Sequence, residues 1–140
     1  METLYLVIPC YNEEEMLPIT AKALMQKMDR LISERKIASD SKVMFVDDGS
    51  KDRTWEIIEK LHSLNRMFTG VKLSRNKGHQ KALLAGLMTA KNYADILISM
   101  DADLQDDIDA IDGFHEKRAE GCDIVYGVRS SREKDTAFKR

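Results

Sequence analysis

Short apolar segments alternate with longer amphipathic segments along the chain. The short segments are rich in Val, Ile and Leu, and each one ends close to a Gly, Pro, Asn or Asp residue. This pattern is typical of strands that are buried in a parallel sheet. It predicts strands at residues 4–8, 43–46, 71–73, 96–98 and 123–126.

The segments between these strands have the periodicity of helices. Apolar residues at steps of three and four predict a helix over 14–35, and similar spacing predicts one over 53–66. A run rich in Ala and Leu with little polar face predicts a buried helix over 79–92. A weaker pattern begins a fourth helix at residue 108, which ends near residue 121.

Alternation of strands and helices predicts an α/β fold. Right-handed crossovers place helices on both faces of a mostly parallel, Rossmann-like sheet, which gives three layers, α/β/α. In such sheets a ligand binds beyond the carboxyl ends of the strands. The residues that follow each strand are therefore the candidates for function.

Length and charge narrow the class of protein. The chain has 140 residues, which fits one domain, and its 22 basic and 24 acidic residues argue against a general nucleic-acid binder. No apolar run approaches the roughly 18 residues that span a bilayer, and acids stand where a signal peptide carries Lys or Arg. Cys10 and Cys122 lack the spacing of a disulfide framework, which suggests a reducing compartment.

The segment after the fourth strand has the sharpest signal. Asp101 and Asp103 lie two residues apart, so on an extended chain their side chains project to the same side. Together with the amide oxygen of Gln105 they form a set of hard oxygen ligands that suits Mg²⁺ or Mn²⁺. The alternative is an acidic first turn of the next helix, which Asp106 and Asp107 fit better.

The first and second strands are followed by residues that suit a nucleoside. Pro9, Tyr11 and Glu13 could stack on a base and accept hydrogen bonds from ribose, although Asn12 could instead cap the next helix with acids in its first turn. Asp47 and Asp48 could accept from a base N–H group or a ribose hydroxyl. The alternative for this acidic pair is a turn that caps the following helix.

Basic residues follow the third and fifth strands. Arg75 or Lys77 could meet a phosphate or base near a helix N-terminus, or could be solvated loop cations. Neither a P-loop pattern nor a G-x-G-x-x-G pattern is present. Arg129 has the forked donor geometry that suits phosphate, although it could belong to a basic surface tail.

These segments, taken together, resemble a known enzyme family. The sequences V-I-P-C-Y-N-E-E, V-D-D-G-S-K-D-R-T, S-R-N-K-G-H-Q-K-A-L-L-A-G, D-A-D-L-Q-D and V-Y-G-V-R resemble the family-2 inverting glycosyltransferases with a GT-A fold. The subgroup most similar is the polyprenyl-phosphate glycosyltransferases, which include dolichol-phosphate mannose synthases and bactoprenol glucosyltransferases. The resemblance covers residues 4 to about 132 in the expected order.

The resemblance implies a role for each matching position. The nucleotide would be bound by Pro9, Tyr11, Glu13, Val46, Asp47, Asp48, Lys77, Asp101, Ala102 and Asp103. Within this set, residues 46–48 match the part that contacts base and ribose, and residues 101–103 match the metal–diphosphate motif. Gln105 matches a further metal ligand. Arg129, and more weakly Arg132, matches an arginine near the diphosphate or the acceptor phosphate, and Asp101, Asp103 and Arg129 would carry the reaction.

The implied activity is metal-dependent transfer of a sugar, with inversion, from a UDP- or GDP-sugar to a polyprenyl phosphate at the cytoplasmic face of a membrane. Residues 1–128 would form the nucleotide-sugar-binding domain. The basic tail at 129–140 would begin a longer membrane-associated acceptor region. One departure is that Ile108 and Asp109 stand where relatives often have two prolines, which affects the entry to the fourth helix.

Other activities remain open from the residues alone. A family-2 transferase acting on a soluble saccharide or growing polysaccharide would have a similar nucleotide half. A D-x-D phosphatase needs its motif on an early strand with a lysine and acids after it. A phosphoacceptor receiver domain needs its acidic pair after the first strand and a lone Asp after the third, where this chain has Ser74 and Arg75.

Overall fold

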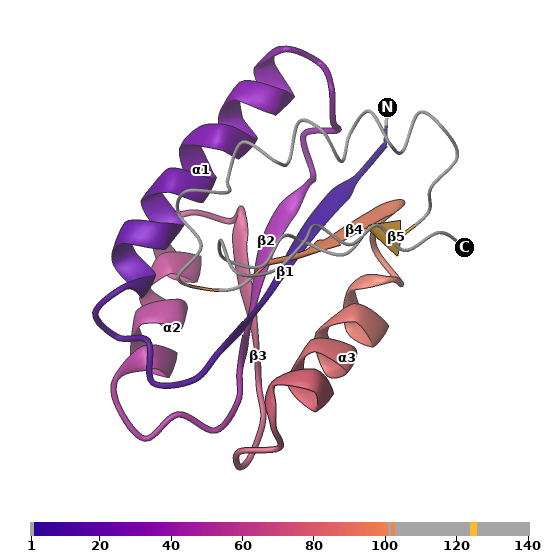
Figure 1. The fold of residues 1–140 in the computed structure, drawn as a ribbon. Helices are drawn as coiled ribbons and strands as arrows, with labels where there is room; N and C mark the ends of the chain where they lie inside the picture. The colour runs from indigo at the N-terminus through magenta and orange to yellow at the C-terminus, as the bar shows by residue number, and fades with distance from the viewer. Residues whose placement is uncertain (1, 101, 103–123, 126–140) are drawn as a thin grey trace, which may run out of the picture.

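The computed structural model describes residues 2–100, 102 and 124–125, and it contains one parallel sheet (Figure 1). The strand order is β3-β2-β1-β4-β5, and every neighbouring pair runs parallel. The strands are β1 (Leu4–Cys10), β2 (Lys42–Asp47), β3 (Phe68–Lys72), β4 (Ile96–Ser99) and β5 (Ile124–Val125). The predicted parallel α/β sheet is confirmed.

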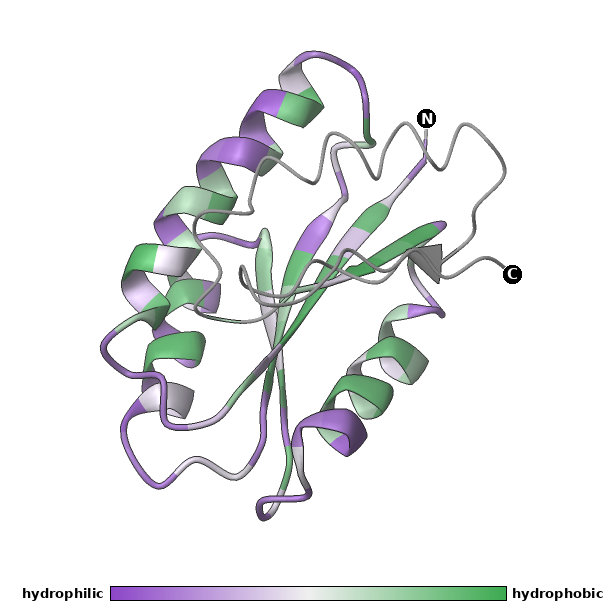
Figure 2. Cartoon of the chain, in the orientation of Figure 1, coloured by the Kyte–Doolittle hydropathy of each residue, from purple (hydrophilic) through white to green (hydrophobic). Residues whose placement is uncertain are grey.

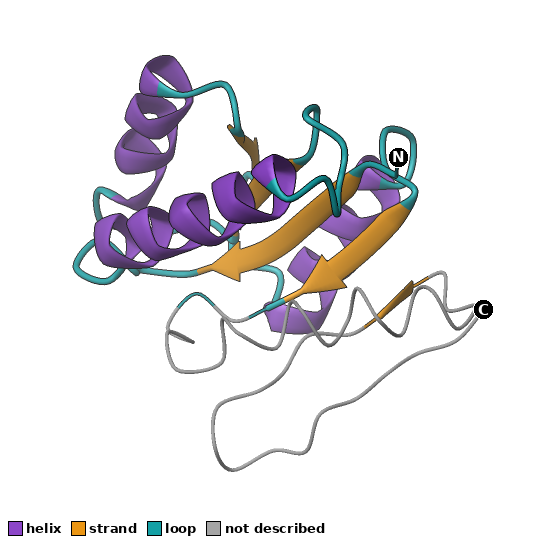
Figure 3. Cartoon of the chain, turned by 90° about the horizontal axis from the view of Figure 1, so that it is seen from above, coloured by secondary structure: helices purple, strands orange, loops and turns teal. Residues whose placement is uncertain are grey.

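Helices cover both faces of this sheet, as the sequence predicts. The helices α1 (Leu17–Ser33) and α2 (Thr54–Leu64) lie on one face, and α3 (His79–Ala90) lies on the other (Figures 1 and 3). Among the described residues, no helix is long and apolar enough to cross a membrane. The predicted fourth helix and the basic tail lie outside the described residues.

Alternate residues of β1 separate the two cores. Leu4, Leu6 and Ile8 pack into the cluster beneath α1 and α2, whereas Tyr5 and Val7 pack into the cluster beneath α3. Because both faces of the strand are covered, its sequence is continuously apolar rather than alternating. The green strands between the helices show this in Figure 2.

The loop before α1 differs from the predicted helix start. The helix begins at Leu17 rather than at residue 14, and Met16 takes the N-cap position without a side-chain cap. Asn12 has a positive φ of 53°, and its side-chain oxygen accepts a hydrogen bond from the Lys51 N–H. The expectation that Asn12 caps the helix is therefore wrong, since its side chain is used by a neighbouring loop.

Two further predictions need correction. Strand β3 begins at Phe68 rather than at residue 71. The sequence pattern misses its first residues because Gly70 interrupts the apolar run that marks a strand. A Cβ at Gly70 would contact the side chains of Ile58 and Trp55, so the glycine lets α2 approach the sheet. Helix α3 is not fully buried: Leu84 and Met88 are 58% and 51% exposed, because the sheet covers only one side of the helix.

Candidate functional site

The carboxyl ends of the central strands meet at one edge of the sheet. Cys10 at the end of β1 pairs with Asp47 at the end of β2, and the Asp48 N–H donates to the Cys10 carbonyl oxygen at 2.8 Å. The chain adds β2 and β3 on one side of β1 and then adds β4 on its other side. The reversal makes this edge a topological switch point, where ligands of α/β proteins bind.

Asp47 is the unusual side chain at this edge. It is fully buried, and its Oδ1 accepts a hydrogen bond from the Ser50 N–H at 3.1 Å. Its Oδ2 has no hydrogen-bond partner among the described residues. A buried carboxylate oxygen without a donor is destabilising by about 1–3 kcal/mol or more. This oxygen is therefore suited to accept a hydrogen bond from a ligand.

Asp48 has a different environment. It is buried, and its Oδ1 and Oδ2 accept hydrogen bonds from the backbone N–H groups of Lys77 and Gly78 at 2.7 and 3.2 Å. Gly49 follows with a φ of 69°, and a Cβ there would clash with the backbone of Arg75 and Asn76. Both features hold the β3–α3 loop against the end of β2, with the Lys77 side chain exposed.

The loop after β1 is fixed against the β2–α2 loop. The Asn12 N–H donates to the Ser50 hydroxyl at 2.8 Å, and the Glu13 N–H donates to the Thr54 hydroxyl at 2.9 Å. Pro9 is buried at the strand end, whereas the Tyr11 ring is 40% exposed. The backbone thus presents an accessible aromatic ring at the edge of the site, which suits stacking on a base.

Asp52 connects the same two loops. Its Oδ1 accepts from the Thr54 N–H and hydroxyl, and its Oδ2 accepts from the Glu14 N–H at 3.2 Å. Partial burial acts to raise the pKa of this carboxyl, but the hydrogen bonds from Thr54 and Glu14 outweigh it and lower the pKa below its ordinary value. Asp52 therefore stabilises the loops in its ionised form.

We expect Asp52→Ala to lower the free energy of unfolding by about 1–2 kcal/mol at neutral pH. The folded-state pKa is lowered, so the stabilisation is complete above the unfolded-state value of 3.8 and is lost as the pH falls through the folded-state pKa. Urea unfolding of the wild type and of Asp52→Ala should show a difference in the free energy of unfolding that shrinks as the pH falls below 3.8. Glu59→Ala, at an exposed acid on α2, is the control and should change little.

Cys10 lies beside Asp47 but is a poor nucleophile. Burial raises the pKa of the Cys10 thiol well above its ordinary value, and the nearby carboxylates of Glu13 and Asp47 raise it further. The thiol also contacts the Ile8 carbonyl oxygen at 3.4 Å. It stays neutral at physiological pH, so covalent catalysis by this cysteine is not supported.

Ala102 is the described residue of the D-A-D segment, and Thr20 of α1 holds it. The Thr20 hydroxyl donates to the Ala102 carbonyl oxygen, and both residues are almost fully buried, at 2% and 3% exposure. The Met100 N–H donates to the Val7 carbonyl oxygen at 3.1 Å, which keeps the chain beside β1 just beyond β4. Thr20 therefore anchors the backbone between Asp101 and Asp103.

We expect Thr20→Val to lower the free energy of unfolding by about 1–3 kcal/mol, because the isosteric change leaves a buried carbonyl oxygen without its donor. Thr20→Ser keeps the hydroxyl and should retain the hydrogen bond, with a smaller loss from the missing methyl group. Thermal and urea unfolding of the two variants would compare them. A larger loss for Thr20→Ser than for Thr20→Val would show that the methyl group, not the hydroxyl, matters.

The structure describes the positions of eight of the predicted site residues. Most of them lie at this edge: Pro9, Tyr11, Glu13, Asp47, Asp48, Lys77 and Ala102. Val46 is also there, but its side chain is fully buried under α3, where a Cβ at Gly86 would touch it. Asp101, Asp103, Gln105, Arg129 and Arg132 lie outside the described residues.

The described residues contain no group of three His, Cys, Asp or Glu side chains that could hold a metal ion. The proposed ligands Asp101, Asp103 and Gln105 supply carboxylate and amide oxygens, which are the donors that Mg²⁺ and Mn²⁺ prefer. Ala102, the described residue between the two aspartates in the sequence, lies beyond the end of β4 at the switch point. The donor set is thus compatible with a divalent cation.

Thr20 and Asn12 have roles that the sequence did not reveal. Thr20 has no motif signal, since it is a polar residue near the start of an amphipathic helix.

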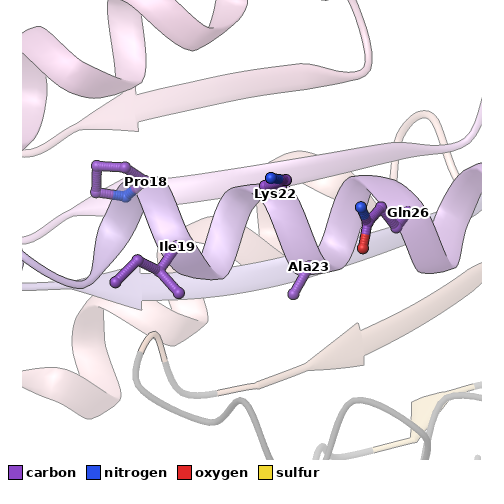
Figure 4. A pocket seen from close by; sticks show the side chains of 5 residues that line it. All are labelled: Pro18, Ile19, Lys22, Ala23 and Gln26. Carbon is purple, nitrogen blue, oxygen red and sulfur yellow. The ribbon is translucent and has the colours of Figure 1, made fainter.

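A hollow of about 460 Å³ on α1 is a separate feature, lined by Pro18, Ile19, Lys22, Ala23 and Gln26 (Figure 4). It contains none of the predicted site residues, so it is not assigned to the nucleotide.

Comparison of the sequence with known proteins gives consistent results. The chain is 58% identical over 137 residues to the uncharacterized glycosyltransferase YkoT of Bacillus subtilis. It is 38% identical over 135 residues to a prophage bactoprenol glucosyl transferase homolog of Escherichia coli, and 37% identical to an undecaprenyl-phosphate 4-deoxy-4-formamido-L-arabinose transferase of Pectobacterium atrosepticum. These matches cover 96–98% of this chain but 38–42% of the relatives.

The chain also matches a solved structure and a family of sequences. The S. aureus TarS structure (residues 1–349) matches with a TM-score of 0.57 and 20% identity, and covers 84% of this chain and 33% of that chain. This likeness supports the fold, which is of the GT-A type. Residues 5–140 match the family described as Glycosyl transferase family 2. The chain therefore belongs to the family-2 glycosyltransferases.

Proposed function

We propose that the chain forms the nucleotide-sugar-binding part of a transferase that moves a sugar from a UDP- or GDP-sugar to a polyprenyl phosphate. The buried Asp47 Oδ2, without a partner among the described residues at the switch-point edge, is the observation that carries the proposal. The names of two relatives, a bactoprenol glucosyl transferase homolog and an undecaprenyl-phosphate transferase, support the lipid acceptor.

The described residues would bind the nucleoside. Asp47 Oδ2 accepts a hydrogen bond from a base N–H group, which would supply the donor that this oxygen lacks among the described residues. The exposed ring of Tyr11 stacks on the base, and Glu13 accepts from ribose. Asp48 holds the β3–α3 loop through backbone N–H groups that donate to both of its oxygens, and a remaining lone pair accepts from the nucleoside. The exposed side chain of Lys77 on this loop would contact a phosphate of the nucleotide.

Mg²⁺ or Mn²⁺ would be held by Asp101 and Asp103, with Gln105 as a further ligand. When bound, the ion stabilises the negative charge that develops on the leaving diphosphate. Thr20 fixes the backbone of Ala102, the residue between these two aspartates in the sequence. Arg129 would contact the diphosphate or the acceptor phosphate through its forked guanidinium.

The acceptor phosphate is anionic at neutral pH, so it attacks the anomeric carbon without a strong general base. Attack from the face opposite the diphosphate forms the new bond to carbon as the diphosphate bond breaks, which inverts the anomeric centre. The acceptor lipid places the reaction at the cytoplasmic face of a membrane. The basic tail at 129–140 would lie near its anionic headgroups.

Calorimetric titration of the chain with UDP, GDP and their sugars, with and without Mn²⁺, tests the proposal. We expect one nucleotide to bind more tightly than the other, and Mn²⁺ to increase the affinity. Asp47→Asn should weaken that nucleotide by about tenfold, because its amide group presents a donor where an acceptor is needed. Failure of both nucleotides to bind, or equal binding by Asp47→Asn, would contradict the proposed site.

A further inference from the structure

Helix α3 has an outer face that the sheet leaves uncovered. Its buried side consists of Ala82, Gly86 and Ala90, which pack on the sheet. The opposite side carries Leu84 and Met88, which are 58% and 51% exposed. Figure 2 shows that the helix is hydrophobic along much of its length and hydrophilic at its first turn. Two large apolar side chains thus face away from the core.

Two lysines flank this apolar pair on the same face. Lys81, Leu84, Met88 and Lys91 follow at steps of three, four and three, which places them within one arc of the helix. Both lysines are exposed. Lysine stems can lie along apolar surface while their ammonium groups reach a polar layer. We call these four residues the α3 outer face.

The surrounding sequence has no acidic residue. Residues 60–94 contain seven Lys and Arg but no Asp or Glu, so all 24 acids of the chain lie elsewhere. An overall charge of −2 therefore hides a strongly positive segment. Lys81 and Lys91 place two of these seven positive charges on the α3 outer face, which gives it the complementarity that an anionic partner requires.

We propose that the α3 outer face docks on the surface of an anionic lipid bilayer. Leu84 and Met88 would enter the boundary between headgroups and acyl chains, and Lys81 and Lys91 would lie at the lipid phosphates. A second copy of the chain fits less well, because a twofold contact through this face brings like-charged lysines together. The inference does not depend on the transfer reaction.

Co-sedimentation of the chain with vesicles tests the inference. Vesicles of phosphatidylcholine and phosphatidylglycerol at a ratio of 70:30 should bind the wild type, and vesicles of phosphatidylcholine alone should bind it much more weakly. Each lysine at an anionic surface contributes about a fivefold gain in partitioning, so Lys81→Gln/Lys91→Gln should lower binding about 25-fold. Leu84→Gln/Met88→Gln should lower it by about tenfold.

The matched control is Lys22→Gln/Lys60→Gln, which removes two exposed lysines from α1 and α2 on the other face of the sheet. It should retain most of the binding. The proposal is overturned if the control pair loses as much as the α3 pair, or if neutral and anionic vesicles bind equally. A dimer that Leu84→Gln/Met88→Gln dissociates, without vesicle binding, would assign the face to a second copy. Nucleotide titration without vesicles tests the transferase proposal separately.

Discussion

Asp103→Ala is expected to lower the rate of sugar transfer at least roughly a hundredfold and to remove the effect of Mn²⁺ on nucleotide affinity, since the variant loses a ligand of the ion that stabilises the leaving diphosphate. The rate is measured as transfer of labelled sugar to undecaprenyl phosphate. The affinity is measured by calorimetry on the chain itself.

Asp106→Asn is the matched control for this substitution. Asp106 lies three residues further on, where an acid fits the first turn of a helix better than a metal site. The control should change transfer by less than about threefold, since it affects helix stability alone. Nucleotide binding that responds to Mn²⁺ equally in the wild type and in Asp103→Ala would count against the metal site and leave the Asp47 interaction untouched.

Gly49→Ala is expected to lower the free energy of unfolding by about 4 kcal/mol, which is a large part of the 5–15 kcal/mol typical of a domain. Its φ of 69° is unfavourable for a residue with a side chain, by about 1–2 kcal/mol. The new methyl group also clashes with the backbone of Arg75 and Asn76, which adds about 1–3 kcal/mol. Urea unfolding measures the change.

Gly78→Ala separates the two contributions. Gly78 has a φ of 98°, but a Cβ there would meet nothing within 4 Å. Gly78→Ala should therefore lower the free energy of unfolding only through backbone strain, by about 2 kcal/mol. If Gly49→Ala lost no more stability than Gly78→Ala, the close contact between the β2–α2 and β3–α3 loops would not matter for stability.

The fold could be predicted because each strand and helix carries the apolar pattern that its own burial requires. Residues 4–8 and 96–98 are continuously apolar because helices cover both faces of the sheet, and the apolar stripe from Leu17 to Leu31 needs a sheet on one side of its helix. The apolar pattern predicts the start of β3 too late, because Gly70 breaks the pattern for a reason that lies in another element, namely the approach of Trp55 and Ile58. Packing across the chain is not visible in a short window.

The candidate site divides in the same way. The sequence by itself determined which residues follow each strand, and therefore that Asp47, Asp48 and Ala102 gather at one edge. The tertiary structure alone decided that both oxygens of Asp48 accept from the backbone of Lys77 and Gly78, whereas one oxygen of Asp47 has no partner in the described part of the chain. It also decided that Thr20 holds Ala102, 82 residues away. Hydrogen bonds between distant loops depend on three-dimensional packing, which residue order does not encode locally.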